Sequence, residues 1–288
     1  GEEGNTTETG SFLSARPINR LITLVGGPLF NLLLGLLLIA FLFTRIGSPN
    51  LSAVEITNVA PDTPAAASGI QVGDIIATVN GVQITSMDAL SKEISSHLGQ
   101  PLDITLVRNG QTISVSATPR KDYPQGQGPL GITISNPTVN VSFFQALPRA
   151  GLATLDQGYQ LIMIPVRLIS GQIAPSDARL VSVKGIYDIY SQVQSVDRAE
   201  AATDPALAGL NTLYFFAVIS IALGYTNLLP IPALDGGRIV FLLPELIFKK
   251  KVPPAIEGRV HMIFYSLLLI LMVVLIINDI VNPVVISR

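Results

Sequence analysis

The sequence of 288 residues contains no cysteine. Disulfide bonds, cysteine-ligated zinc and a thiol nucleophile are therefore excluded anywhere in this chain. Charged residues are also scarce, at 13% of the chain, against about 25% in typical soluble proteins. Hydrophobic residues make up 49%. This imbalance predicts a membrane protein.

Excess positive charge is missing as well, because the formal net charge is −2. A protein that binds a phosphate backbone needs clustered Lys and Arg, so no nucleic acid is expected as a partner. Histidine occurs only as His97 and His261, and neither has a second histidine four residues away or an adjacent glutamate. We expect His97 to be a surface or domain-packing residue and His261 an interfacial or helix-packing residue, and neither to bind a metal.

Three long apolar segments stand out against this background, at residues 21–43, 207–229 and 260–277. At 1.5 Å rise per residue, the 23 residues of the first cover the hydrocarbon core of about 30 Å. The second is more polar, which suits the inside of a helix bundle. We expect three helices that span a lipid bilayer.

Basic residues predict the orientation of these helices, because short cytoplasmic loops are enriched in Lys and Arg. Arg16 and Arg20 precede the first span, and a run of basic residues lies between the second and third. Both segments are expected on the cytoplasmic side. The intervening residues 47–205 are then expected on the outer side.

Within that outer region, residues 53–118 have the pattern of a small β-rich domain. Short apolar β-type runs alternate with turns, and Asn109-Gly110 is a two-residue hairpin signal. Residues 88–97 have the pattern of a helix. The order of elements, with the phrase PAAASGIQVGDIIATVNGVQI, resembles a PDZ domain of the kind attached to bacterial proteases. The resemblance implies peptide binding or size filtering; a β-rich spacer without a ligand is the alternative.

The segment 143–170 carries its polar residues at spacings of 4, 7, 4 and 7, which places them on one stripe of a helix. This pattern predicts an amphipathic helix at the membrane surface or against other helices. A fourth spanning helix is the alternative, but it would bring charged residues near hydrocarbon and reverse the orientation. Pro148 and Pro165 predict breaks in this helix.

The chemistry-bearing segment follows the second span and reads NLLPIPALDGGR, from Asn227 to Arg238. Pro230 and Pro232 break the helix, and two glycines beside Asp235 permit close backbone approach. A carboxylate near bilayer depth costs about 2.5–3.5 kcal/mol, so Asp235 needs a partner such as a cation. In the alternative interpretation, Asp235 is only the N-cap of a helix over residues 236–248.

This segment closely resembles the Asn-x-x-Pro-x-Pro-x-Leu-Asp-Gly motif of site-2 proteases, which are intramembrane zinc metalloproteases. The first span carries GGPLFN, from Gly26 to Asn31, which resembles the Gly-Pro-x-x-Asn motif of the same family. The resemblance implies Zn²⁺ as cofactor, with Asp235 as its third ligand. It also implies a catalytic, substrate-contacting Asn227 and further substrate-binding positions at Gly27, Pro28, Asn31, Pro230 and Pro232. For the two asparagines, hydrogen bonding between helices is the alternative role.

The sequence departs from the family in one respect, because it contains no H-E-x-x-H motif to supply two histidine ligands and a glutamate base. In the family that motif lies on the first transmembrane helix, so we expect it upstream of this sequence. A catalytically inactive membrane-bound PDZ binding protein is the alternative function. A transporter is a third hypothesis, but it predicts paired helix breaks, and only one is found.

The predicted fold is a polytopic α-helical membrane protein with an inserted PDZ-like extracytoplasmic domain, located in the inner (plasma) membrane. The expected partners are single-span membrane protein substrates of the anti-sigma factor or remnant signal peptide type, and peptide segments at the PDZ-like domain. The expected divisions are a cytoplasmic lead (1–20), a first span (21–45), the PDZ-like domain (46–120), a linker with the amphipathic helix (121–206), the second span with the zinc-ligand segment (207–248), a basic loop (249–259) and the last span (260–280).

Overall fold

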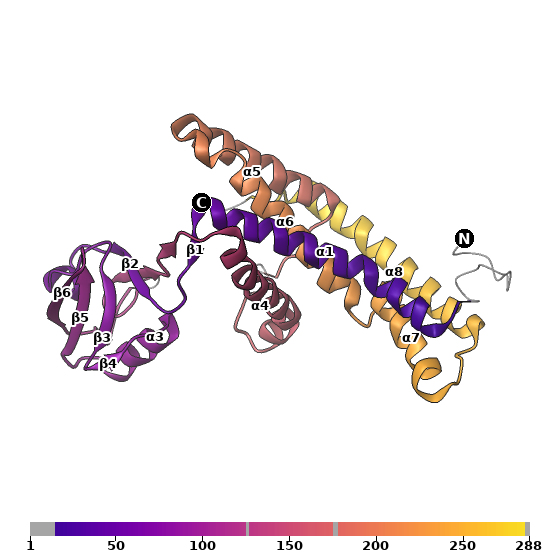
Figure 1. Ribbon diagram of the computed structural model, residues 1–288, viewed down its shortest axis with the longest axis horizontal. Coiled ribbons are helices and arrows are strands. Elements are labelled where there is room, and N and C mark those ends of the chain that lie inside the picture. Colours follow the sequence, from indigo (N-terminus) through magenta and orange to yellow (C-terminus); the bar gives the residue numbers. More distant parts are fainter. Residues whose placement is uncertain (1–14, 125–126, 175–177, 286–288) are drawn as a thin grey trace. The chain divides into compact units, whose positions relative to one another are not determined.

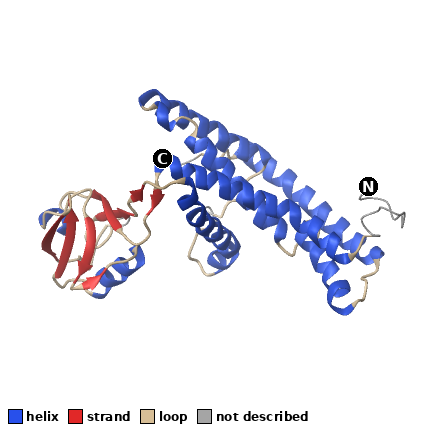
Figure 2. Cartoon of the chain, in the orientation of Figure 1, coloured by secondary structure: helices blue, strands red, loops and turns tan. Residues whose placement is uncertain are grey.

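The structure is a computed structural model that describes residues 15–124, 127–174 and 178–285 (Figure 1). It divides into two compact units. One unit consists of Ile46–Val141, and the other of Gly1–Arg45 together with Ser142–Arg288. Strands lie in the first unit and long helices in the second (Figure 2).

The first unit, here called the sheet unit, is built on an antiparallel sheet with the order β6-β5-β3-β2-β7, with β4 paired to β3. A separate two-stranded ladder joins β1 to β8. The strands are β1 (Ser48–Pro49), β2 (Val54–Val59), β3 (Ile75–Val79), β4 (Val82–Gln83), β5 (Leu102–Arg108), β6 (Gln111–Ala117), β7 (Ile132–Ser135) and β8 (Thr138–Val139). The helices are α2 (Pro64–Ala67) and α3 (Met87–Ser96).

Side-chain alternation places the core of this unit on one face of the sheet. In β5, Leu102, Ile104 and Leu106 are fully or almost fully buried, as period-two patterning requires. The β5–β6 hairpin turns at Asn109 and Gly110, both with positive φ, which the mirror-image two-residue turn needs. The expected small β-rich region is therefore present.

The sheet unit extends beyond the expected boundary at residue 120. Strand β7 pairs antiparallel with β2, with Ile56 opposite Ile134. Leu130, just before β7, is buried in the same hydrophobic core. The segment expected as linker thus contains a strand, β7, whose pairing partner β2 lies far away in the sequence and left no local signal.

The second unit, here called the helical unit, contains α1 (Pro17–Ile46), α4 (Phe143–Ile169), α5 (Val183–Thr203), the short 3₁₀ turn η2 (Pro205–Leu207), α6 (Leu210–Leu228), α7 (Asp235–Phe248) and α8 (Pro254–Val281) (Figure 1). Three stretches are long and apolar enough to cross a membrane: α1, Pro205–Leu228 and α8. Ile270 and Val274 of α8 are more than half exposed, as lipid-facing side chains would be. Among the described residues, the number of helices long and apolar enough to span a membrane is therefore the expected one.

Helix α4 is continuous, which corrects the expectation of breaks at Pro148 and Pro165. Each proline removes one backbone donor, but the helix has a small-residue face that packs on α6. Gly158 lies directly beneath the ring of Tyr225, where any Cβ would collide with the ring. Packing of this face holds the helix together despite the two missing hydrogen bonds.

Helix α5 was not expected, and two aspartates tie its ends to neighbouring helices. Asp279 of α8 accepts hydrogen bonds of 2.7 Å from both the backbone N–H and the hydroxyl of Ser182, the N-cap of α5. Asp197 near the other end accepts from the backbone N–H groups of Asn211 and Thr212, in the first turn of α6, at 3.0 and 2.9 Å. Each carboxylate thus satisfies the free donors at the start of a neighbouring helix.

The buried Asp74 of the sheet unit predicts a pH-dependent stability. Its carboxylate accepts bonds of 2.7 and 2.8 Å from Arg108, and these bonds hold its pKa below the ordinary value despite the opposing effect of burial. A depressed folded pKa contributes stability that is present above the unfolded pKa of about 3.9 and is lost as pH falls through the folded pKa.

Melting of residues 46–141, followed by circular dichroism between pH 7 and 2, should therefore show a fall in midpoint below about pH 4. In Asp74→Asn the midpoint should be lower at pH 7 and its decline with acid shallower. Asp122→Asn, at an exposed position, should follow the unmodified chain. An Asp74→Asn curve parallel to the unmodified one would contradict the assignment.

Candidate active site at the break after helix α6

Helices α1 and α6 are packed closely, and this packing brings the two sequence motifs together. The hydroxyl of Ser220 donates a 2.8 Å hydrogen bond to the backbone carbonyl of Asn31. One turn further along α6, a Cβ placed on Gly224 would lie 3.0 Å from the carbonyl oxygen of Pro28 and 2.6 Å from Cδ2 of Leu32. The glycine therefore permits the close approach of the two helices.

The residues expected to hold substrate lie on these two helices. Gly27, Pro28 and Asn31 belong to α1, and Pro28 is inside the helix and buried. Asn227 is the penultimate residue of α6. The side chains of Asn31 and Asn227 are partly exposed and make no hydrogen bond with any of the described residues. Both amides are therefore available to another molecule.

After α6 the chain runs through a non-helical loop, residues 229–234, before α7 begins. Pro230 and Pro232 have no N–H, and the other loop donors are used. Ile231 donates to the carbonyl of Leu229 at 2.7 Å, and Leu234 donates to that of Ile231 at 3.1 Å. The N–H of Ala233 donates to Nδ1 of His261, on α8, at 2.9 Å.

Two glycines at the start of α7 let the loop fold back on this helix. A Cβ on Gly236 would collide with the carbonyl oxygens of Leu228 and Leu229, and one on Gly237 with the carbonyl oxygen of Ile231. Both glycines are buried. The obstacles are backbone atoms, so a side chain here could only be accommodated by displacing the loop.

Asp235 is the first residue of α7, and the N-cap position belongs to Leu234. The interpretation of Asp235 as a simple N-cap is therefore wrong. Its carboxylate makes no hydrogen bond or ion pair with any of the described residues. At a helix N-terminus the backbone dipole favours this negative charge. The structure thus presents a partly buried carboxylate ready to bind a cation.

The far end of α7 is held independently by an ion pair with α1. Nη1 of Arg20 lies 2.8 Å from Oε2 of Glu245, and the side chains are only 10% and 13% exposed. Lys251 lies 3.4 Å from the other oxygen of the same glutamate. The ion pair therefore holds α7, which begins with Asp235, against α1, which carries the GGPLFN motif.

The donor set for a zinc ion is incomplete within the described residues. Catalytic zinc takes three protein ligands, usually His with Asp, Glu or Cys. No three such side chains gather anywhere in the ranges that the structure covers. Asp235 fits as one ligand by its charge, exposure and lack of another partner. The two remaining ligands must come from elsewhere if zinc binds here.

The two histidines have different surroundings. His97 is the C-cap of α3, and its Nδ1 lies 3.0 Å from the carbonyl oxygen of Glu93. His261 packs against the ring of Phe241, with centroids 5.5 Å apart, as a helix-packing residue does. Its bond to Ala233 was not foreseen, because the only sequence signal was a lone polar side chain near the start of an apolar helix.

Comparison with known proteins assigns the chain to a family. Residues 2–271 match the description "Peptidase family M50". This chain belongs to that family. It is 32% identical over 265 residues to zinc metalloprotease RasP of Shouchella clausii, covering 91% of this chain and 59% of the relative. It is 32% identical over 293 residues to putative zinc metalloprotease Cj1068 of Campylobacter jejuni, covering 97% and 73%.

The M50 chain thus spans about three fifths of the RasP relative's length. Solved structures match shorter parts of it. The HtrA-type protease AlgW with a decapeptide matches 24% of this chain and 22% of its own chain, at 27% identity and a TM-score of 0.23. The PDZ domain of an SdrC-like protein from Listeria monocytogenes matches 29% at 23% identity and a TM-score of 0.26. At these scores the likeness establishes neither fold nor function.

The close contacts of Gly236 and Gly237 predict that a side chain at either position destabilises the protein. Gly237→Ala should lower the free energy of unfolding by about 1–3 kcal/mol, because the new methyl group meets backbone that cannot rotate away. Gly151→Ala on α4 is the matched control, since a Cβ there meets nothing within 4 Å. Thermal unfolding in detergent measures both. Equal stability of the two variants would show that the loop does not lie against α7.

Proposed function

We propose that this M50 chain is part of an intramembrane zinc metalloprotease that hydrolyses peptide bonds in or near the transmembrane segments of single-span membrane proteins. The observation that carries the proposal is Asp235: a carboxylate without a partner among the described residues, just after the break that follows α6, a helix in a stretch long and apolar enough to cross a membrane. Family membership and the names of the relatives support the same chemistry.

In this proposal Asp235 is one zinc ligand. Two histidines and a glutamate base come from an H-E-x-x-H motif that the 288 residues do not contain. A bound Zn²⁺ supplies a Lewis acid and a water whose pKa is lowered to about 7. Asp235 contributes charge and geometry but transfers no proton. Asp235 is the first residue of α7, where the helix dipole favours its negative charge.

The amide of Asn227, two residues before the loop, is free to hydrogen-bond the substrate backbone near the scissile bond. A transmembrane substrate helix satisfies its own backbone, so it must unwind locally before cleavage. The non-helical loop that contains Pro230 and Pro232 offers a partner to the unwound segment. Gly27, Pro28 and Asn31 on α1 lie close to α6 and complete the proposed substrate-holding region.

The placement in the cell is part of the proposal. The basic residues around Arg20 and between α7 and α8 support a cytoplasmic position for the Asp235 end of the helices. The sheet unit would then lie outside the cytoplasm, in a multi-pass protein of the inner (plasma) membrane. Substrates of the anti-sigma factor and remnant signal peptide types both fit this topology, since each has a single membrane span.

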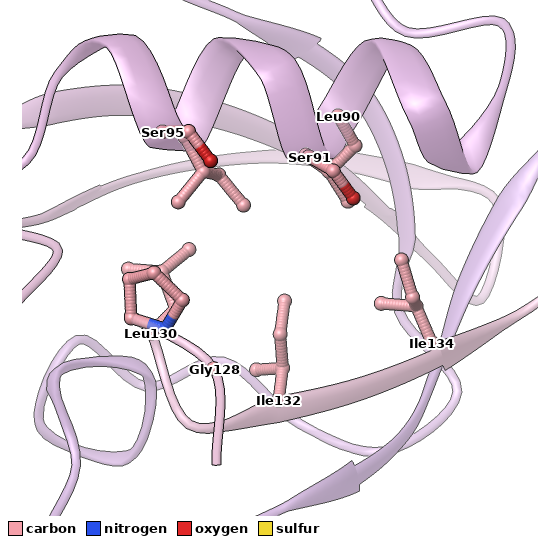
Figure 3. Close-up of a pocket in the computed structure, with 9 residues that line it drawn as sticks. Leu90, Ser91, Ser95, Gly128, Leu130, Ile132 and Ile134 are labelled. Atoms are coloured by element: carbon pink, nitrogen blue, oxygen red, sulfur yellow. The ribbon is translucent and has the colours of Figure 1, made fainter. Parts of the chain in front are cut away.

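A second binding site is proposed in the sheet unit, at a groove of about 250 Å³ between α3 and β7. Figure 3 shows side chains from the helix and from the strand pointing toward one another across it. Its walls are largely apolar, with Leu90 and Ile94 on one side and Ile132 and Ile134 on the other. Because β7 is the end strand of the sheet, an extended peptide could pair with its edge, as in PDZ recognition.

The proposed catalytic function predicts that Asp235→Ala abolishes cleavage in the full-length protein. Cleavage of a tagged single-span substrate should fall at least about 10³-fold, because a zinc site that loses a ligand loses its bound water as nucleophile. Zinc content after dialysis, measured by atomic absorption, should fall as well. Asp156→Ala, on the exposed polar stripe of α4, is the control. Full cleavage by the Asp235 variant would refute the assignment.

The proposed peptide groove predicts that Ser91→Trp, on the groove side of α3, weakens peptide binding at least about tenfold by filling the cavity. Lys92→Trp carries the same side chain one residue further along, at a position that does not line the groove, and should bind normally. Fluorescence anisotropy with a labelled peptide that has an apolar C-terminus measures both. Equal affinities, or no binding by the unmodified protein, would count against the groove.

A further inference from the structure

Among the described residues, the loop between α6 and α7 makes one hydrogen bond to a helix other than the two that it joins. His261 of α8 accepts this bond. The N–H of Ala233 points to Nδ1 of His261 at 2.9 Å. Ala233 is two residues before Asp235, and its φ of 82° is a backbone conformation that side-chain-bearing residues rarely adopt. A strained backbone of this kind persists only where the surroundings hold it.

The chemistry of the bond defines the state of the imidazole. A backbone N–H can only donate, so Nδ1 must be unprotonated and the ring hydrogen must be on Nε2. That atom is buried and has no hydrogen-bond partner among the described residues. Its nearest carboxylate oxygen, on Glu257, is 4.0 Å away, beyond hydrogen-bond length. Among the described residues, the hydrogen bond of His261 is therefore the one from the loop.

The position of Asp235 is then set from two sides. The far end of α7 is tied to α1 through Glu245 and Arg20. The near end is tied to α8 through Ala233 and His261. Loss of the second tie leaves the partly buried N–H of Ala233 without its acceptor, so the loop must move to find another. Any such movement displaces Asp235.

We propose that His261 is a positioning residue for the active site: by accepting the Ala233 N–H it holds the loop in the strained conformation that places the Asp235 carboxylate for zinc. This inference rests on the proposed function, since it assumes that Asp235 binds zinc. His261 itself contacts neither the metal nor the substrate. Its role is that of an outer partner that orients a ligand.

Three substitutions in the full-length protein separate this role from simple packing. His261→Asn retains an acceptor on the γ-carbon, close to the position of Nδ1, but loses the ring. His261→Leu has the same branched shape as Asn without an acceptor. His261→Phe retains the ring against Phe241 but has no acceptor. Zinc affinity by competition with a chromophoric chelator, kcat and KM for a tagged substrate, and hydrogen exchange of peptides covering residues 229–235 are measured for each.

Positioning predicts that the Leu and Phe variants lose about 10- to 100-fold in zinc affinity. Their kcat should fall more than KM rises, and amide exchange in the loop should become faster. The Asn variant should recover most of each property. Packing alone predicts the reverse order, with Phe close to the unmodified protein and Asn impaired, and that result would overturn the inference. If the Phe variant does not fold, the comparison of Asn with Leu decides.

Asp235→Ala, measured in parallel, distinguishes a failure of the proposed function from a failure of the positioning role of His261. If Asp235→Ala leaves zinc affinity and cleavage unchanged, the proposed function fails whatever the His261 variants do. If Asp235→Ala abolishes both while His261→Leu and His261→Phe alter neither, the proposed function stands and only the positioning role is refuted.

Discussion

The need to satisfy every backbone donor in an apolar environment shapes the central part of this structure. A helix does so internally, but the chain leaves the helix after α6 and runs through six residues before α7. Two of these six are prolines, which have no N–H to satisfy. Bonds within the loop and the bond to His261 serve Ile231, Leu234 and Ala233. A non-helical backbone can therefore follow α6, which lies in a stretch long and apolar enough to cross a membrane.

Aspartates near helix N-termini have contrasting roles in the helical unit. Asp279 and Asp197 each accept several hydrogen bonds from the first turn of a neighbouring helix, and both are buried. They are structural. Asp235 also lies at a helix start but makes no such bonds within the described residues. The difference leaves Asp235 without a structural role among the described contacts, and the proposed role as a zinc ligand requires such a free carboxylate.

Much of the fold could be predicted because its signals are local. The spans followed from uninterrupted apolar length, strand β5 from alternation, and the β5–β6 turn from Asn109-Gly110. What was missed depends on distant partners. Strand β7 pairs with β2, its neighbour in the sheet, although the two strands are far apart in the sequence. Helix α5 is held by Asp279 and Asp197. Helix α4 continues through two prolines because α6 supports its buried face.

The candidate site likewise has features that local sequence predicts and features that depend on distant contacts. Asp235, Asn227 and the glycines were identified from their spacing in one short motif, since residue type and order carry that information. The sequence alone thus determined that the chain belongs in a membrane, that a helix breaks after Asn227, and that a carboxylate follows the break. Only the tertiary structure decided that Asp235 lacks a partner among the described residues, that the glycines receive the returning loop, and that His261 completes its hydrogen bonding. Those facts depend on contacts between helices that are far apart in the chain, which no local pattern encodes.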